Sequence, residues 1–195
     1  MKKLIVAEFV SLDGVMQAPG GAEEDMDGGF VHGGWTMPYW HDDMGATLLQ
    51  EIQQADTLLL GRKTWQTHAG AFEAASPDEP FAALLNSLKK YVVSTTLKSA
   101  DAWRNSTIIR ENVEEQVRKL KEQPGKDIYV DGSSLLVHTL ARADLVDEYH
   151  LLVFPVVLGS GKRVFPDGLH VPLKLIEAKP FPSGVTLLHY QPDRK

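Results

Sequence analysis

Short apolar runs separated by amphipathic segments dominate the first 145 residues. The runs Leu4–Val10, Thr57–Leu60 and Tyr91–Thr95 each end at glycine or hydroxyl residues, as buried strands commonly do. Further strands are predicted at Thr107–Arg110, Ile128–Val130, Glu148–Val157, Val171–Lys179 and Val185–Tyr190. Because strands alternate with helical patterns over this region, the sequence predicts a largely parallel sheet.

The amphipathic segments between these strands predict the helices. Asp42 or Asp43 is expected to cap a helix that continues to about Ala55. Asn112 is expected to cap another helix, with Glu115 at the capping-box position. Further helices are predicted to begin at about Lys63, at Phe81 and after Ser133.

The C-terminal region lacks helical patterns. Pro182-Ser183-Gly184 is a turn between the last two predicted strands, which must therefore run antiparallel. The chain shows neither an internal repeat nor a convincing linker. We interpret it as one α/β domain over residues 1–195, with a mixed, mostly parallel sheet and an antiparallel C-terminal hairpin.

A glycine-rich segment from Val15 to about His41 has no periodicity. Loops of this length are uncommon in compact domains and are usually functional or disordered. Trp35 and Trp40 offer apolar surface that could close over a ligand. We therefore expect a lid or a pocket wall.

Composition and charge narrow the function classes. The absence of cysteine excludes disulfides, thiolate metal sites and cysteine nucleophiles, and a formal net charge of −6 argues against a general nucleic-acid partner. No window has the roughly 18 apolar residues that span a bilayer. Glu8 and Asp13 interrupt the apolar N-terminus, which is interpreted as a strand and not as a signal peptide. We expect a cytoplasmic protein without a membrane partner.

Candidate chemistry begins where the strand Thr57–Leu60 meets Gly61. Arg62, Lys63 and Thr64 follow directly, at the expected start of a helix. The free N–H groups of a helix N-terminus form an anion site, and two cations strengthen it. A nucleotide phosphate would fit there, whereas the alternative is a solvated Arg-Lys pair at a turn.

Two other strand ends carry similar groups. Ser94-Thr95-Thr96 offers hydroxyls, and Gly132-Ser133-Ser134 offers a second helix start. Carboxyl ends of parallel strands share one edge, so these segments could converge on one phosphate-bearing dinucleotide. The Gly-x-Gly-x-x-Gly pattern of ordinary Rossmann domains and the Walker P-loop are both missing.

Metal-binding patterns are not evident in the sequence. The seven histidines lack spacings such as His-Glu-x-x-His, so we expect no metal site. The acidic run from Glu23 to Asp27 does not have the spacing of a calcium loop, and it is interpreted as a solvated loop.

Four ordered motifs resemble one known family. They are Ser11-Leu12-Asp13-Gly14, Leu60-Gly61-Arg62-Lys63-Thr64-Trp65, Val130-Asp131-Gly132-Ser133, and Leu145-Val146-Asp147-Glu148-Tyr149 with Pro155–Gly161. In this order they resemble the dihydrofolate reductase-like superfamily, and most of all the reductase domain of the bacterial riboflavin-biosynthesis deaminase/reductase. The resemblance covers nearly the whole chain. It implies a mixed eight-stranded sheet with helices on both faces, and an NADPH site.

The resemblance also implies roles for individual residues. Arg62, Lys63 and Thr64 would contact the cofactor phosphates and would share the adenosine 2′-phosphate with Ser94 and Thr95. The pyrophosphate would lie against Gly132, Ser133, Ser134 and Leu135, where Ser133 replaces the second glycine of the family's Gly-Gly pair. The nicotinamide would lie beside Ala7, under the Val15–His41 loop.

Two positions compete for the substrate-side carboxylate. Asp42 and Asp43 lie near where dihydrofolate reductases place their pterin-binding acid, although the spacing to Gly61 is longer here. Asp13 lies in the motif shared with the riboflavin reductase domain. Each acid has a structural alternative, because Asp13 could form a turn and Asp42 or Asp43 could cap a helix.

The resemblance implies an NADPH-dependent reductase of a small heterocyclic substrate, with Asp13 or Asp43 as the catalytic carboxylate. The phosphoribosylamino-pyrimidine of riboflavin synthesis is the first candidate substrate and dihydrofolate the second. Deamination is excluded, because the zinc half of the bifunctional enzyme needs cysteine ligands. A non-catalytic nucleotide-binding oligomer of the same fold is the alternative. The apolar strand Glu148–Val157 suggests a homodimer.

Overall fold

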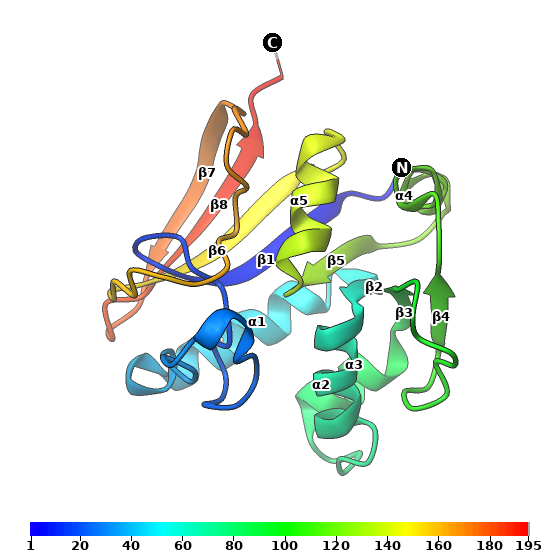
Figure 1. The fold of residues 1–195 in the computed structure, drawn as a ribbon, viewed down its shortest axis with the longest axis horizontal. Coiled ribbons are helices and arrows are strands. Elements are labelled where there is room, and N and C mark those ends of the chain that lie inside the picture. Colours follow the sequence, from blue (N-terminus) through cyan, green and yellow to red (C-terminus); the bar gives the residue numbers. More distant parts are fainter. Residues whose placement is uncertain (195) are drawn as a thin grey trace.

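The computed structural model describes residues 1–194, and its centre is an eight-stranded sheet in the order β4-β3-β2-β5-β1-β6-β8-β7 (Figure 1). The strands are β1 (Leu4–Ser11), β2 (Ala55–Gly61), β3 (Lys89–Val93), β4 (Ser106–Ile109), β5 (Asp127–Asp131), β6 (Glu148–Phe154), β7 (Leu173–Pro180) and β8 (Thr186–Pro192). Strand β8 pairs antiparallel with β6 and β7, and the other pairings are parallel. The predicted mixed, mostly parallel sheet is therefore confirmed.

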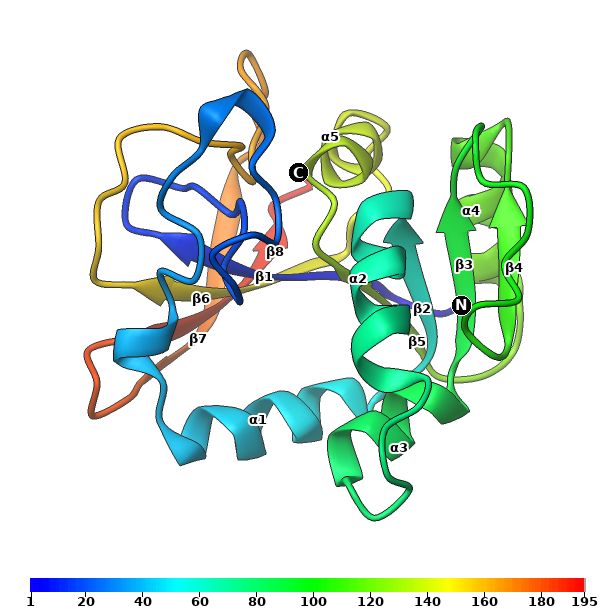
Figure 2. The same ribbon diagram turned by 60° about the horizontal axis from the view of Figure 1, so that its bottom comes forward.

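Helices cover both faces of this sheet (Figure 2). They are α1 (Asp42–Ile52), α2 (Arg62–Phe72), α3 (Pro80–Ser87), α4 (Val113–Glu122) and α5 (Ser134–Arg142), with short 3-10 turns at Asp27–Gly29 and Met37–Tyr39. Helices α1, α2 and α3 share a core with one face, and α4 and α5 share a core with the other. Across residues 1–194, each helix is too short or too polar to cross a membrane.

Strand β1 shows why the sheet needs both layers. Leu4 and Val6 are buried against α4 and α5, whereas Ile5 and Ala7 are buried against the opposite helices. A parallel strand covered on both faces is a continuous apolar run, as the N-terminal sequence has. The charged exception within this run is Glu8, which is also buried.

Some predicted boundaries differ for local physical reasons. Strand β6 ends at Phe154 rather than Val157, because Pro155 has no N–H to donate to a ladder. Helix α1 is capped by His41, whose ring accepts from the Asp43 N–H, and not by Asp42 or Asp43.

The predicted capping box at the start of α4 was wrong. Asn112 has φ +52°, in the left-handed region, and its side chain makes no capping hydrogen bond. Glu115 forms an ion pair with Lys119 one turn along the helix instead of closing back on the cap. The helix still begins at Val113, because its apolar stripe faces the core.

The strand predicted to carry self-association is an interior strand. β6 lies between β1 and β8, so both of its backbone edges are already paired.

The long Gly-rich segment from Val15 to about His41 is held in place by Trp35. Trp35 is buried, and its Nε1 donates to the Gln17 carbonyl at 2.8 Å while its ring packs edge-on against Phe154.

Candidate functional site

A cavity of about 1590 Å³ lies at the carboxyl ends of β1, β2, β3 and β5. It is larger than the roughly 300–1,000 Å³ typical of small-ligand pockets, so it has room for an extended ligand. Its lining includes every residue expected to bind the cofactor: Ala7, Gly61, Arg62, Lys63, Thr64, Ser94, Thr95, Gly132, Ser133, Ser134 and Leu135. The structure thus brings the three predicted strand ends to one cavity.

The ends of β2 and β5 touch each other. The Ser133 Oγ accepts the Gly61 N–H at 2.8 Å and lies 2.8 Å from the Thr64 Oγ1. A Cβ on Gly61 would approach that Oγ to 2.5 Å. Gly132, at φ +66°, would place a Cβ 2.7 Å from the Thr64 Oγ1. Both glycines are therefore required for this close approach, and Ser133 at the family's second glycine position bonds the two strand ends together.

The starts of α2 and α5 face the same cavity. Gly61 precedes α2 and Ser133 precedes α5, and neither helix has a side-chain cap. Uncapped N-termini leave backbone N–H groups available to an anion. Leu135 is exposed on the first turn of α5 and adds an apolar surface to the cavity.

Two cations sit at the first turn of α2 with different partners. Arg62 donates to the Gln66 Oε1 at 2.9 Å along its own helix. Lys63 forms ion pairs with Asp25 and Asp27, and its hydrogen bond to Asp27 raises the pKa of Lys63. Lys63 is therefore tied to the Gly-rich loop.

The acidic run was expected to be a solvated loop, and this was wrong for Asp25. Only 18% of its side chain is exposed, and it also pairs with Lys162 at 2.5 Å. Burial raises the pKa of Asp25, but the bonds from Lys162 and Lys63 outweigh it and leave the pKa lowered. These ion pairs fix the loop as one wall of the cavity.

The end of β3 contributes hydroxyl groups. The Ser94 Oγ accepts the Thr96 and Leu97 N–H groups at 3.2 and 2.9 Å, which shapes the turn. Thr95 is exposed and lines the cavity. Ser94 therefore organises the turn, and Thr95 presents a free surface to the cavity.

Asp13 lies outside the cavity lining, in a turn. Its Oδ1 accepts from the Ser11 Oγ at 2.7 Å and the Leu158 N–H at 3.1 Å, and its Oδ2 accepts the Gly159 N–H at 2.8 Å. These bonds, led by Ser11, lower the pKa of Asp13 to about 2. Both carboxylate oxygens are thus engaged in joining the end of β1 to the segment after β6.

Asp42 and Asp43 also lie outside the cavity lining. Both are exposed in the first turn of α1, and Asp43 lies 3.4 Å from the His41 ring. Carboxylates in a first helical turn stabilise the helix dipole. The structure therefore does not bring any of the three predicted substrate-side acids to the cavity.

A different acid–base group does line the cavity. The His68 Nε2 lies 2.7 Å from the Asp131 Oδ2, and both side chains face the cavity. Burial lowers the pKa of His68, but the Asp131 carboxylate outweighs it and raises the pKa above its ordinary value. Ala7 pairs with Asp131 in the sheet, so this dyad adjoins the expected nicotinamide position.

Glu8 is the third ionisable group there. Burial raises its pKa well above the usual range, and nearby Asp131 raises it further. Its Oε2 accepts the Gly132 N–H at 3.0 Å, while its Oε1 has no hydrogen-bond partner among residues 1–194. Glu8 therefore lines the cavity with a raised pKa, and its hydrogen bond fixes the Gly132 turn.

Sequence reasoning missed these three residues, although each carried a signal. Glu8 is the single acid within an apolar strand, and Asp131 is the last residue of β5, inside a motif already noted. His68 follows Thr64 by one helical turn, so it shares the cavity-facing side of α2. Their proximity depends on pairing between strands distant in the sequence.

The residues present suit a nicotinamide dinucleotide. Two uncapped helix starts and the cations Arg62 and Lys63 match its phosphates, and the cavity volume accommodates its length. The His68–Asp131 dyad adds an acid–base group to the lining of the same cavity.

Structures with this fold include three reductase or biosynthetic proteins. A putative riboflavin biosynthesis protein from Shewanella sp. PV-4 superposes with a TM-score of 0.73 at 19% identity, covering 98% of this chain and 99% of that one. A pyrimidine reductase-like protein from Corynebacterium diphtheriae gives 0.69 at 13% identity, covering 100% and 93%. Dihydrofolate reductase from Enterococcus faecalis, complexed with NADP(H), gives 0.63 at 14% identity, covering 98% and 97%. The predicted dihydrofolate reductase-like fold is confirmed.

Sequence comparison identifies the family of this chain, whereas the structural comparison identifies only its fold. The uncharacterized protein YyaP of Bacillus subtilis is 34% identical over 193 residues, which is 97% of this chain and 94% of that protein. The uncharacterized protein YwjB of the same organism is 30% identical over 139 residues, or 71% and 74%. Residues 2–187 match the model of the RibD C-terminal domain. The chain therefore belongs to the RibD C-terminal domain family, as the ordered motifs predicted.

Proposed function

We propose that this protein is an NADPH-dependent reductase that transfers hydride to a C=N or related bond of a small heterocyclic substrate. The observation that carries the proposal is the single cavity in which three phosphate-suited strand ends meet Ala7 and the His68–Asp131 dyad. Family membership supports an oxidoreductase. The NADP(H) complex of the dihydrofolate reductase of the same fold supports a nicotinamide cofactor.

The proposed binding follows the charges of the cavity. Arg62, Lys63 and Thr64 bind phosphate at the start of α2 and share the 2′-phosphate with Ser94 and Thr95. The segment from Gly132 to Leu135 binds the pyrophosphate at the start of α5. Lys63 is paired with Asp25 and Asp27. Phosphate binding therefore replaces these ion pairs with an ion pair between Lys63 and the ligand phosphate.

Bound NADPH supplies the hydride, and the protein supplies position and a proton. Ala7 would lie against the nicotinamide, and the loop wall would exclude water from the cavity. Reduction of a C=N bond also needs a proton at nitrogen. We expected Asp13 or Asp43 in this role. The His68–Asp131 dyad takes their place in the proposal, because it lines the cavity and the Asp131 carboxylate, bonded to His68 Nε2, raises the pKa of the imidazole. The charged ring would deliver the proton from its other nitrogen.

The substrate that best fits the family and neighbours is 5-amino-6-(5-phosphoribosylamino)uracil, the pyrimidine of riboflavin biosynthesis. Its ring suits the apolar part of the cavity wall. Dihydrofolate is the second candidate, on the dihydrofolate reductase fold alone.

The test mixes the protein with NADPH and each candidate substrate. Loss of nicotinamide absorbance that requires substrate is the expected result. Quenching of protein fluorescence without that loss would identify a non-catalytic nucleotide-binding protein. If calorimetry detects no binding of NADPH or NADH, the proposal is refuted.

Arg62→Ala tests the phosphate assignment. Loss of one phosphate cation is expected to remove the preference for NADPH over NADH, at a cost of about 1.5–3 kcal/mol in NADPH binding, the range of a charge-assisted hydrogen bond. Arg142→Ala is the matched control, because Arg142 is exposed on α5 outside the cavity lining. Equal preference in wild type and Arg62→Ala would refute the 2′-phosphate role.

A further inference from the structure

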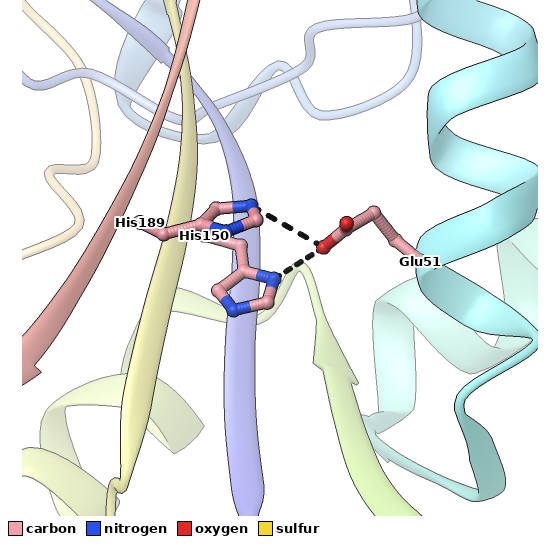
Figure 3. Close-up of side chains that lie close together, drawn as sticks. All are labelled: Glu51, His150 and His189. Carbon is pink, nitrogen blue, oxygen red and sulfur yellow. Dashed lines mark hydrogen bonds and ion pairs between the residues drawn. The ribbon is translucent and has the colours of Figure 1, made fainter. Parts of the chain in front are cut away.

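A second cluster of ionisable side chains lies beside the cavity on the sheet face that α1 covers. It consists of Glu51 from α1, His150 from β6 and His189 from β8, and Figure 3 shows both rings directed at the carboxylate. The strand register places the two histidines in one row with Ala7. His150 pairs with Ala7 on one side and with His189 on the other.

The three side chains present their ligand atoms to one point. The His150 Nδ1 bonds to the Glu51 Oε2, and the His189 Nε2 lies 3.4 Å from the same oxygen. All three ligand atoms lie within 4.8 Å of one another. The His189 Nε2 is buried and has no hydrogen-bond partner among residues 1–194. Burying a nitrogen without a hydrogen-bond partner costs free energy. A ligand at the His189 Nε2 would therefore stabilise this cluster.

Each histidine also meets a second carboxylate on its outer side. The His150 Nε2 lies 3.0 Å from the Glu148 Oε2, and the His189 Nδ1 lies 3.5 Å from the Glu177 Oε2. A metal-bound histidine characteristically donates its other N–H to a carboxylate, which fixes the ring and its tautomer. Both histidines here have that outer partner, from β6 and β7.

The charge balance favours a cation at the centre. The carboxylates of Glu51, Glu148 and Glu177 surround the two imidazole rings. A metal ion at the inner nitrogens would balance this negative charge and leave the outer N–H groups to Glu148 and Glu177.

We propose that the Glu51 Oε2, His150 Nδ1 and His189 Nε2 bind one divalent transition-metal ion of the Zn²⁺ class. Imidazole nitrogens select this class over Mg²⁺ and Ca²⁺, which take oxygen ligands. Three protein ligands leave a fourth position of a tetrahedral ion for water. The sequence could not indicate this site, because its ligands come from three separate elements.

Binding requires a small movement of one ring. The two imidazoles stack with centroids 3.7 Å apart and planes at 16°, so their lone pairs run side by side. A shared ion needs the lone pairs to converge, and the ring of His189 tilts without losing a hydrogen bond at Nε2. Its side chain is 15% exposed, which leaves a route from solvent.

The metal would act on the cavity through α1. Glu51 is one residue from the end of that helix, and Leu48, Leu49 and Ile52 of the same helix line the cavity. An ion held by both α1 and the sheet fixes the distance between them. The ligands themselves do not line the cavity, so the ion positions the wall and takes no part in hydride transfer.

Calorimetric titration of the chelator-treated full chain with Zn²⁺ tests the proposal. We expect saturable binding of one ion per chain, together with a rise in Tm. Co²⁺ serves as a second probe, since its visible absorption reports imidazole and carboxylate ligands. His189→Ala and Glu51→Gln are expected to weaken Zn²⁺ binding about 10-fold or more, and Glu177→Gln, at an exposed outer carboxylate, about 10-fold.

His170→Ala is the matched control, because His170 is exposed and does not belong to the cluster. It should bind Zn²⁺ as the wild type does. Circular dichroism of each metal-free variant establishes that it is folded, and Glu177→Gln keeps the test valid if a ligand variant is not. Absence of saturable Zn²⁺ binding to the wild type, or equal losses in His170→Ala and His189→Ala, would overturn the proposal. Neither result affects the NADPH measurements.

Discussion

At the scale of single residues, the cavity is defined by side chains whose ionisation the fold controls. Glu8 is pushed toward its neutral form by burial, whereas His68 is pushed toward its charged form by Asp131. Groups with perturbed pKa values in one cavity are characteristic of functional sites. The dyad therefore offers the sharpest residue-level test of the proposed reaction.

Asp131→Asn is expected to move the pH dependence of turnover. The pKa of His68 is raised by Asp131, so its acid form persists above its ordinary range and is lost as pH rises further. Without the carboxylate, that pKa falls and the descending limb of kcat against pH shifts to lower pH. General acid catalysis supplies about 10²–10⁴-fold in rate, so His68→Gln should lower kcat within that range.

Binding of NADPH, measured by fluorescence, is the control for both variants, because the dyad is assigned no contact with the phosphates. An unchanged pH profile in Asp131→Asn would contradict the assignment of the proton to His68.

At the scale of elements, the turn that joins β1 to the segment after β6 depends on Asp13. Its two oxygens accept three hydrogen bonds, two of them from the backbone of Leu158 and Gly159. The same acid was one of three candidates for contact with substrate. Stability and turnover measurements separate the two roles.

Asp13→Ala is expected to lower the free energy of unfolding by about 1–3 kcal/mol, the cost of unsatisfied hydrogen-bonding groups. The pKa of Asp13 is lowered to about 2, so its contribution is full above the unfolded pKa of about 4. That contribution is lost as pH falls through about 2. Chemical denaturation at several pH values measures the difference between variant and wild type.

Asp43→Ala is the control, since Asp43 is exposed with one weak partner, and it should change stability by less than about 0.5 kcal/mol. Full stability with lost turnover in Asp13→Ala would instead support contact with substrate.

At the scale of the whole molecule, the sheet ends in a strand that solvent reaches. Leu175 and Ile176 of β7 are 49% and 50% exposed, and most of that strand is exposed with them. An open edge with apolar side chains is a surface for self-association. The homodimer proposed from the sequence is therefore better supported by β7 than by the interior strand β6.

Sedimentation analysis is expected to give a mass of two chains for the wild type. Ile176→Lys should shift it to one chain, because a buried lysine would be unpaired in the interface. Val157→Lys is the matched control, on an exposed residue of the originally suspected segment. A monomeric wild type, or dissociation by Val157→Lys alone, would refute an interface at β7.

Local patterns in the sequence were sufficient for the elements and for the phosphate-suited strand ends. Buried strands are apolar runs, and glycines such as Gly132 mark turns that admit no other residue. The pattern therefore located β1, β2 and β5, and the order of motifs indicated the family. The helix boundary at Asn112 was correct, but the capping box predicted there was wrong, because the left-handed backbone of Asn112 leaves its side chain without a capping hydrogen bond.

The sequence by itself determined a mostly parallel α/β sheet with its glycine turns and cations at one edge, because those features depend on residues adjacent in the chain. The tertiary structure decided which ionisable groups meet. It brought His68 next to Asp131 and engaged both carboxylate oxygens of Asp13 in hydrogen bonds within a turn. It also gathered Glu51, His150 and His189 from three elements. Such groups interact through space over a few ångströms, whereas the sequence positions that they occupy are tens of residues apart.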